Sequence, residues 1–282
     1  MRSLLFVPGV SEKMILKARD TDADALILDL EDAVSPDRKA EARQTVMRML
    51  SEVDFGVMPV FVRVNRLDTG FGEEDAKAVA ASRAFGAVLP KVERPEEVTA
   101  VVQLLASHQK LIAMIESPRG VLNCPAIAEA SPMLNGPMLA GLMFGSADFT
   151  VLARGRLTEG EPELIVARSR MLYSARAAGI EAYDAPYFSI PDLDGLRRAS
   201  ELVRNLGYDG RAVIHPSHIA VVNEVFSPSE EEIANARGIV AAMKDALDRG
   251  LAAVQHEGAL IEPLHARAAE RILAVAEKLS AG

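Results

Sequence analysis

The segment that decides the fold lies near the N-terminus and reads Ala25-Leu26-Ile27-Leu28-Asp29-Leu30-Glu31-Asp32. A continuous apolar run is followed directly by acidic residues. A continuous run, unlike an alternating one, is typical of a strand that is covered on both faces. The segment therefore predicts a buried strand whose carboxyl end opens onto polar groups.

Similar apolar runs recur along the chain, with amphipathic helical patterns between them. We expect strands over Ser3–Val7, Ala25–Asp29, Pro59–Val64, Ala87–Pro90, Leu111–Ile115, Met138–Phe144, Ile180–Asp184 and Arg211–Ile214. The clearest expected helices are Lys39–Leu50, Pro95–Leu105, Glu161–Ala178 and Asp192–Leu206. Strands that alternate with helices favour parallel pairing with right-handed crossovers. Eight such strands in about 215 residues predict a (β/α)8 TIM barrel, with an open doubly wound sheet as the alternative.

The last part of the chain exceeds what a barrel needs. We expect residues 1–226 to form the barrel and residues 227–282 to form a C-terminal helical extension of the same functional unit. Within the extension, a long helix is expected over Glu230–Leu251 and a final helix over Leu264–Leu279, with the short segment Val254–Ile261 between them extended.

The composition excludes several classes of protein. The 282 residues carry a net charge of −9, which argues against nucleic-acid binding, because phosphate contacts need clustered positive charge. The single cysteine, Cys124, excludes an intrachain disulfide framework. The longest apolar runs, such as Met138–Phe144, are far shorter than a membrane span, and the N-terminus does not resemble a secretion signal. We expect a cytoplasmic protein.

Polar side chains follow most of the expected strands, and in a barrel they would converge at one mouth. Glu116 and Asp148 stand out because each is a carboxylate that follows an apolar run with few other charges nearby. Two neighbouring carboxylates repel each other, and a hard cation such as Mg²⁺ relieves that repulsion. The alternative is that Glu116 forms a structural ion pair with Arg119 or Lys91.

Two cationic side chains also lie at expected strand ends. Arg63 is flanked by apolar residues, and its planar guanidinium suits a substrate carboxylate; the alternative is a salt bridge to Glu31 or Asp32, and the two roles can coexist. Lys91 raises a rival chemistry, Schiff-base formation with a carbonyl substrate. Nearby acids would oppose it by keeping the amine charged. The small residues at 145–147 allow backbone N–H groups to approach an anionic oxygen.

Taken together, these motifs resemble the citrate lyase β-subunit-like proteins of the HpcH/HpaI aldolase family. The resemblance covers nearly the whole chain. It is carried by the segments Arg2–Gly9, Asp29–Val34, Phe61–Asn65, Leu89–Lys91, Ile115–Ser117, Gly145–Phe149, Gly207–Gly210 and Ile214–Pro216.

The resemblance implies a Mg²⁺-dependent (β/α)8 barrel, often trimeric, that cleaves or forms a short 3-hydroxy-carboxyacyl-CoA. Citramalyl-, malyl-, citryl- and hydroxymethylglutaryl-CoA are the substrate types of such proteins. By motif match, Glu116 and Asp148 would hold Mg²⁺ and Arg63 would bind the substrate. Glu31 and Asp32 would lie near the waters bound to the metal. The backbone of Gly145, Ser146 and Ala147 would contact the keto-acid carboxylate.

The chain departs from the family pattern at two positions. Ala147 stands where several relatives carry Glu. Glu262 stands before Pro263, where related lyases carry an Asp that acts as an acid or base in a neighbouring subunit's site, so Glu262 is a candidate catalytic residue. Two other functions stay open: a β subunit that acts on an acyl-carrier-protein thioester in a citrate lyase complex, and a metal-dependent aldolase that needs no CoA.

Overall fold

The computed structural model describes residues 1–130 and 138–281. Eight parallel strands follow one another in chain order and close into a barrel, with the last strand paired to the first. The strands are β1 (Ser3–Pro8), β2 (Ala25–Asp29), β3 (Val60–Arg63), β4 (Gly86–Leu89), β5 (Lys110–Ile115), β6 (Met138–Phe144), β7 (Glu181–Asp184) and β8 (Gly210–Val213). The predicted TIM barrel is confirmed, with strand ends shifted by at most one residue, and the open doubly wound alternative is wrong.

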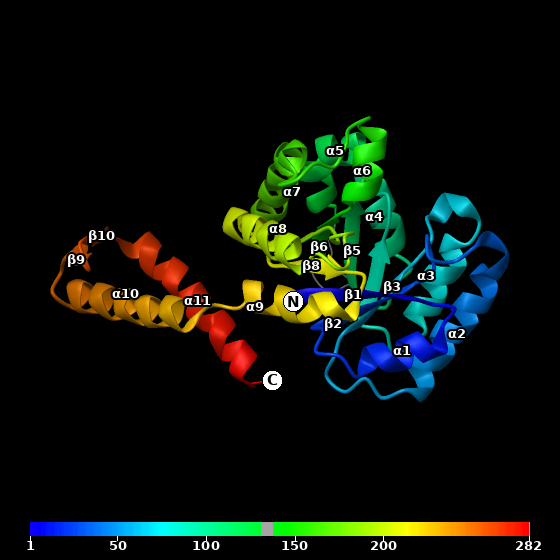
Figure 1. Ribbon diagram of the computed structural model, residues 1–282, viewed down its shortest axis with the longest axis horizontal. Helices are drawn as coiled ribbons and strands as arrows, with labels where there is room; N and C mark the ends of the chain where they lie inside the picture. The colour runs from blue at the N-terminus through cyan, green and yellow to red at the C-terminus, as the bar shows by residue number, and fades with distance from the viewer. Residues whose placement is uncertain (131–137, 282) are drawn as a thin grey trace. The chain divides into compact units, whose positions relative to one another are not determined.

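Helices connect the strands and lie around the barrel (Figure 1). They are α1 (Glu12–Arg19), α2 (Lys39–Glu52), α3 (Gly72–Ala80), α4 (Pro95–Val102), α5 (Pro118–Ala128), α6 (Ser146–Leu152), α7 (Ile165–Ala177), α8 (Leu193–Leu206) and α9 (Ile219–Phe226). Short 3₁₀ turns lie at Pro36–Arg38, Leu67–Thr69, Pro162–Leu164 and Pro216–His218.

Two of the barrel helices differ from their predicted bounds by three residues or more. The helix expected from Glu161 begins at Ile165, because Glu161 has a φ of +48°, outside the right-handed helical region, and a 3₁₀ turn intervenes. The helix expected to reach Leu105 ends at Val102. Beyond it the backbone tightens, with the Leu104 N–H donating to the carbonyl three residues back at 2.9 Å.

The strands separate two apolar cores. The inner core fills the barrel and includes Leu4, Ile27, Phe61, Val88 and Tyr183. The outer core lies between the strands and the surrounding helices, and residues adjacent to these in the sequence, such as Leu26 and Val62, belong to it. Alternation along each strand therefore decides which side chains face inward.

Residues Ser227–Gly282 form a second compact unit, distinct from Met1–Phe226. It contains α10 (Glu230–Asp248), β9 (Val254–His256), β10 (Ala259–Ile261) and α11 (Pro263–Ala281). The segment expected to be extended is an antiparallel hairpin, and the first helix ends three residues before the predicted Leu251. Helices α10 and α11 pack together around a small core that contains Met243, Ala246 and Ile261.

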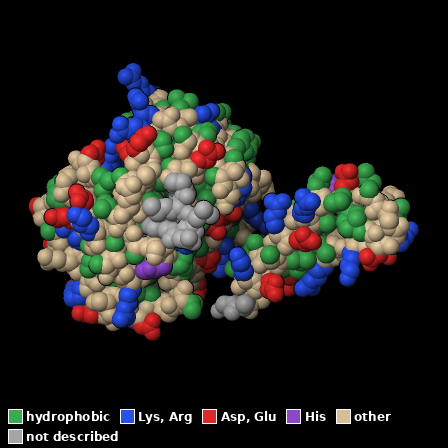
Figure 2. Space-filling model, turned by 180° about the vertical axis from the view of Figure 1, so that it is seen from behind, with side chains coloured by type: hydrophobic (Ala, Val, Ile, Leu, Met, Phe, Trp, Pro, Cys, Tyr) green, Lys and Arg blue, Asp and Glu red, His purple; other side chains and the backbone are tan. Residues whose placement is uncertain are grey.

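The surface of the larger unit carries charges of both signs, interspersed on the face shown in Figure 2. Surface ion pairs contribute to this pattern; Arg197, for example, lies 2.6 Å from Glu224. Among the residues that the structure describes, no helix combines the length and apolar character needed to cross a bilayer.

Candidate functional site at the barrel mouth

The strand register places Asp29 and Arg63 side by side at the carboxyl end of the barrel. Ile27 on β2 and Phe61 on β3 are paired neighbours that face inward. Side chains repeat every two residues along a strand, so Asp29 and Arg63 also face inward, one layer nearer the mouth. The mouth is where TIM-barrel active sites lie.

The same periodicity positions Glu116. Met114 on β5 faces the inner core, and Glu116 follows it by two residues. The neighbouring Gly145 makes room for this side chain, because a Cβ at position 145 would lie 2.5 Å from Cγ of Glu116. Asp148, in the first turn of α6, completes this side of the mouth.

Arg63 is held by carboxylates on several sides. Its Nε and Nη2 donate to the two oxygens of Asp29 at 2.7 and 2.6 Å. The expected ion pairs with Glu31 and Asp32 are also present, at 3.0 and 4.0 Å. Burial would lower the pKa of Arg63, but its hydrogen bonds to Asp29 and the surrounding negative charges outweigh this and hold the pKa above its ordinary value. The guanidinium therefore stays charged.

Lys91 is surrounded by acidic groups. Its Nζ donates to Glu31 and, at 3.0 Å, to Asp32, and it lies 3.7 Å from Asp148. Burial opposes the charge, but these partners raise the pKa of Lys91 above its ordinary value. A Schiff-base lysine needs the opposite shift, so the structure does not favour that alternative. Lys91 also has a φ of +54°, a strained backbone conformation of the kind that clusters at functional sites.

Glu31 and Asp32 are adjacent in the sequence but differ in proton affinity. Burial raises the pKa of Glu31 despite its contacts with Arg63 and Lys91. For Asp32, burial is outweighed by the hydrogen bond and charge of Lys91, so the pKa is lowered. Neighbouring acids with divergent pKa values are a recurrent feature of proton-transfer sites.

Glu116 is the most isolated carboxylate of the group. Its side chain is buried, and its Oε1 has no hydrogen-bond partner. Burial, and next the interaction with the nearby Asp148 carboxylate, raise the pKa of Glu116 to about 8. The alternative ion pairs with Arg119 and Lys91 are absent from the described residues; Arg119 lies 3.6 Å from Glu93 instead. A buried, unpaired carboxylate oxygen next to a second carboxylate suits a hard divalent cation.

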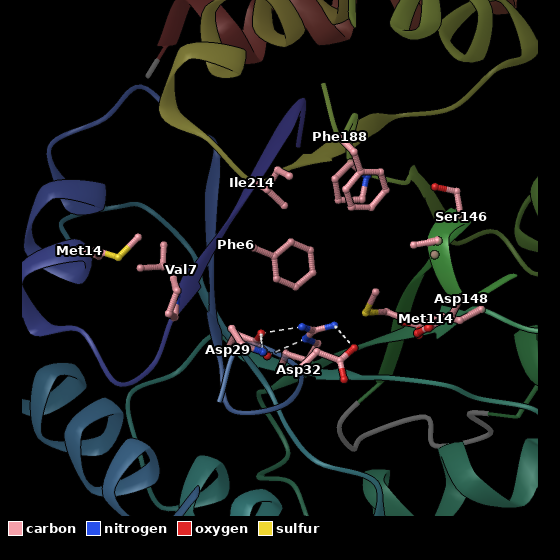
Figure 3. A pocket seen from close by; sticks show the side chains of 17 residues that line it. Phe6, Val7, Met14, Asp29, Asp32, Met114, Ser146, Asp148, Phe188 and Ile214 are labelled. Atoms are coloured by element: carbon pink, nitrogen blue, oxygen red, sulfur yellow. Dashed lines mark hydrogen bonds and ion pairs between the residues drawn. The ribbon is translucent and has the colours of Figure 1, made fainter. Parts of the chain in front are cut away.

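These side chains open onto one pocket of about 400 Å³ (Figure 3). Arg63, Asp32, Glu116, Asp148 and residues 145–147 all line it. Glu31 does not line the pocket, but it forms an ion pair with Arg63, which does. In the parts of the chain that are described, no group of three or more His, Cys, Asp and Glu side chains is arranged to hold a metal. A metal here would have two protein carboxylates, a number that suits Mg²⁺.

Glu262 belongs to the second unit. It lies between β10 and α11, is exposed, and its backbone N–H donates to Nδ1 of His265 at 3.0 Å.

Sequence reasoning assigned no role to Asp29, although it is central to the site. Besides Arg63, its carboxylate accepts the backbone N–H groups of Glu31 at 2.9 Å and Ala33 at 3.1 Å, and so shapes the turn after β2. The alternation of side chains along the strand could have identified Asp29, because it lies two residues after Ile27, which faces the barrel interior. Its bond to Arg63 depends on strand pairing, which the sequence does not show.

A closed parallel barrel with ionisable side chains gathered at the carboxyl ends of its strands is the architecture of TIM-barrel enzymes. Residues 2–216 match the family described as HpcH/HpaI aldolase/citrate lyase. The chain belongs to that family. Residues 167–280 also match the family described as C-C bond lyase of the TIM-barrel fold.

Several characterised proteins are similar over almost their whole length. A (3S)-malyl-CoA thioesterase of Cereibacter sphaeroides is 37% identical over 280 residues, which is 99% of this chain and 96% of that protein. The citrate lyase subunit beta of Leuconostoc mesenteroides is 34% identical, with coverage of 98% and 93%. The structure of CitE from Mycobacterium tuberculosis in complex with magnesium, acetoacetate and coenzyme A has a TM-score of 0.80 at 28% identity, with 98% of each chain covered.

Proposed function

We propose that this protein is a Mg²⁺-dependent carbon–carbon lyase. It cleaves or forms a short 3-hydroxy-carboxyacyl-CoA, with an acyl-CoA and a keto acid as the other partners of the reaction. The observation that carries the proposal is the buried Glu116, which has an unpaired oxygen and lines the same pocket as Asp148 and Arg63. Membership of the family and similarity to proteins named for CoA thioesters support it.

Glu116 and Asp148 are the proposed ligands of Mg²⁺. The nearby Asp148 carboxylate helps to raise the pKa of Glu116, and a divalent cation bound by both groups would balance their negative charge. When bound, the cation supplies positive charge that stabilises the oxygen on which negative charge develops and polarises the nascent carbonyl. Through it, Glu116 would also contribute to substrate binding.

In the cleavage direction, a base takes the proton of the 3-hydroxyl group. The bond between C2 and C3 then breaks, its electron pair remains on C2 as the thioester enolate, and C3 becomes the carbonyl carbon of the keto acid. Protonation of C2 completes the acyl-CoA. Glu31, Asp32 and Glu262 are the candidates for proton transfer. Asp32, whose pKa Lys91 lowers, is suited to hold negative charge, whereas the raised pKa of Glu31 suits it to carry a proton.

Arg63 is proposed to bind the substrate carboxylate or keto-acid oxygen and to stabilise the charge that develops there. The backbone at 145–147 is the second proposed anion contact. The Gly145 N–H donates to the carbonyl of Ile115 at 3.0 Å, so this contact falls to the amides of Ser146 and Ala147. Both residues line the pocket.

We also propose a cytoplasmic homotrimer, on the strength of the resemblance to the family. In related lyases an Asp from one subunit acts in the site of another, and Glu262 stands at that position. Sedimentation of the purified protein tests the assembly: a trimer of the 30.3 kDa chain supports it, and a monomer at assay concentration contradicts it.

The function is tested by incubating the protein with citramalyl-, malyl-, citryl- and hydroxymethylglutaryl-CoA, with Mg²⁺ or EDTA, and reading the products by mass spectrometry. EDTA-sensitive release of an acyl-CoA and a keto acid supports the lyase. If no product forms from any of these thioesters, the proposed lyase function is contradicted. Two further arms, a thioester on an acyl carrier protein and free keto acid with aldehyde, then distinguish a citrate lyase subunit from an aldolase that needs no CoA.

A further inference from the structure

The pocket at the barrel mouth is divided into two halves of opposite chemistry. The ionisable half comes from the ends of β2, β3 and β5 and from the start of α6. The other half, which we call the apolar wall, comes from β1, α1, the loop after β7 and the residue after β8. It consists of Phe6, Met14, Pro186, Phe188 and Ile214. In Figure 3, Phe188 and Ile214 lie across the pocket from Asp29 and Asp32, and Phe6 lies between the two groups.

The ionisable half already has an excess of negative charge. Its cluster contains five carboxylates, from Asp29, Glu31, Asp32, Glu116 and Asp148, and two cationic side chains, Arg63 and Lys91. With one divalent cation and all of its acids ionised, the cluster would carry a net charge of −1. One substrate carboxylate can bind through the cation and Arg63, but no positive charge is left to balance a second, which would have to lie elsewhere.

The apolar wall offers nothing to a second carboxylate. It contains no Lys, Arg or His side chain among the described residues that line the pocket. Phe6, which belongs to the wall, lies with its ring over the Arg63 guanidinium, 4.9 Å from ring centroid to Cζ, and so covers that face of the cation. A carboxylate placed there would lose its hydration without gaining a partner, which is strongly unfavourable. An alkyl group would instead cover Phe188 and Ile214, which are 49% and 36% exposed.

We propose that the apolar wall is the specificity determinant of the reaction, and that it selects substrates whose carbinol carbon carries one carboxylate and one alkyl group. This inference rests on the proposed lyase function. Cleavage of such a substrate gives an acyl-CoA and a 2-oxo acid with an alkyl side chain. Substrates that carry a carboxymethyl group in place of the alkyl group are disfavoured.

Two thioesters that differ at this one substituent test the inference. The carbinol carbon of citramalyl-CoA carries a methyl group, whereas that of citryl-CoA carries a carboxymethyl group. With Mg²⁺, we expect kcat/KM to be at least about 50-fold higher for citramalyl-CoA, since the penalty for an unpaired carboxylate adds to the modest preference for a methyl group. Equal rates, or faster cleavage of citryl-CoA, would overturn the inference while leaving the lyase function intact.

Position 214 provides a matched pair of variants. Ile214→Lys places a cation on the apolar wall and is expected to reduce the preference for citramalyl-CoA at least about 10-fold. Ile214→Met has a similar unbranched stem without the charge and should keep the wild-type preference. If both variants keep the preference and change KM by the same factor for both thioesters, the wall contacts the CoA chain that the two substrates share. The inference is then wrong.

Binding of the keto acids separates this inference from the lyase function. Calorimetry with Mg²⁺ compares pyruvate with freshly prepared oxaloacetate, the 2-oxo acids that correspond to the two thioesters. We expect pyruvate to bind at least about 10-fold more tightly. If no thioester is cleaved, the lyase function fails, and this measurement still decides whether the wall selects an alkyl group. Tighter binding of oxaloacetate contradicts the inference in either case.

Discussion

Glu116 is both a buried carboxylate and a proposed ligand of Mg²⁺. Replacement by Gln keeps the shape and removes the negative charge. We expect Glu116→Gln to weaken Mg²⁺ binding at least about 10-fold and to lower kcat/KM by about 100-fold, because one of two carboxylate ligands is lost. The metal-free variant should be at least as stable as the wild type, since it no longer buries a carboxylate with an unpaired oxygen.

Calorimetric titration with Mg²⁺ and a urea denaturation curve measure these two effects. Glu93→Gln is the matched control. Glu93 also follows a strand, but its partners are Ser117 at 2.6 Å and Arg119 at 3.6 Å, and it does not line the pocket. Wild-type Mg²⁺ affinity in Glu116→Gln would show that the ligand assignment is wrong.

The pair formed by Asp29 and Arg63 is a second residue-scale case, because it separates stability from activity. Arg63→Met leaves the Asp29 carboxylate buried without its bidentate partner, and we expect a loss of about 3–5 kcal/mol in the free energy of unfolding. Arg63→Met with Asp29→Asn should recover part of the stability but none of the activity. Recovery of activity in the double variant would mean that Arg63 only neutralises Asp29.

At the scale of elements, α5 shows how two helices depend on each other. Pro125 lies inside α5 and has no N–H, so the carbonyl of Val121 lacks its usual helical donor. Arg170 on α7 supplies donors instead, with Nε 2.8 Å from that carbonyl and Nη2 2.6 Å from the carbonyl of Leu122. A proline that would weaken an isolated helix is thus accommodated by a side chain of its neighbour.

We therefore expect Arg170→Met to lower the free energy of unfolding by about 1–3 kcal/mol. Pro125→Ala restores a backbone donor and should reduce that loss when combined with Arg170→Met. Chemical denaturation of the single and double variants measures the coupling. Strictly additive effects would show that Arg170 does not replace the missing donor. Arg197→Met, which breaks a surface pair with Glu224 at 2.6 Å, is the control and should cost less than about 1 kcal/mol.

The elements were easier to predict than the contacts between them. Strands β2 and β5 are almost entirely apolar runs. Both could therefore be recognised from the local sequence alone. The 3₁₀ turn at Pro162–Leu164 was missed because it depends on the φ of Glu161. The pairing of Asp29 with Arg63 was missed because strand register is a property of the closed sheet. Glu116 and Asp148 were predicted to be neighbours, since strand ends must converge in a barrel.

At the scale of the whole molecule, Glu262 tests whether the second unit takes part in the reaction. We expect Glu262→Gln to lower kcat at least about 10-fold, because it removes a proton-transfer group, while the melting temperature and Mg²⁺ affinity stay unchanged. Glu257→Gln is the matched control: it alters an exposed carboxylate at the turn of the β9–β10 hairpin. Full activity in Glu262→Gln would assign proton transfer to Glu31 and Asp32 alone.

The two compact units also differ in how much core each contains. The barrel unit contains both large apolar clusters, whereas the apolar cluster found among the described residues of the second unit has four buried members, Met243, Ala246, Ile261 and Ala266. A segment of this size with so small a core is marginal by itself. We therefore expect a chain that ends at Phe226 to keep the main calorimetric unfolding transition of the full-length protein, shifted by less than about 5 °C, while residues 227–282 alone stay largely unfolded. Loss of a cooperative transition in the shortened chain would show that the barrel depends on the second unit for its stability. If the transition is kept but activity is lost, as we expect, then the contribution of the second unit is to the reaction, and the Glu262→Gln variant should account for most of that loss.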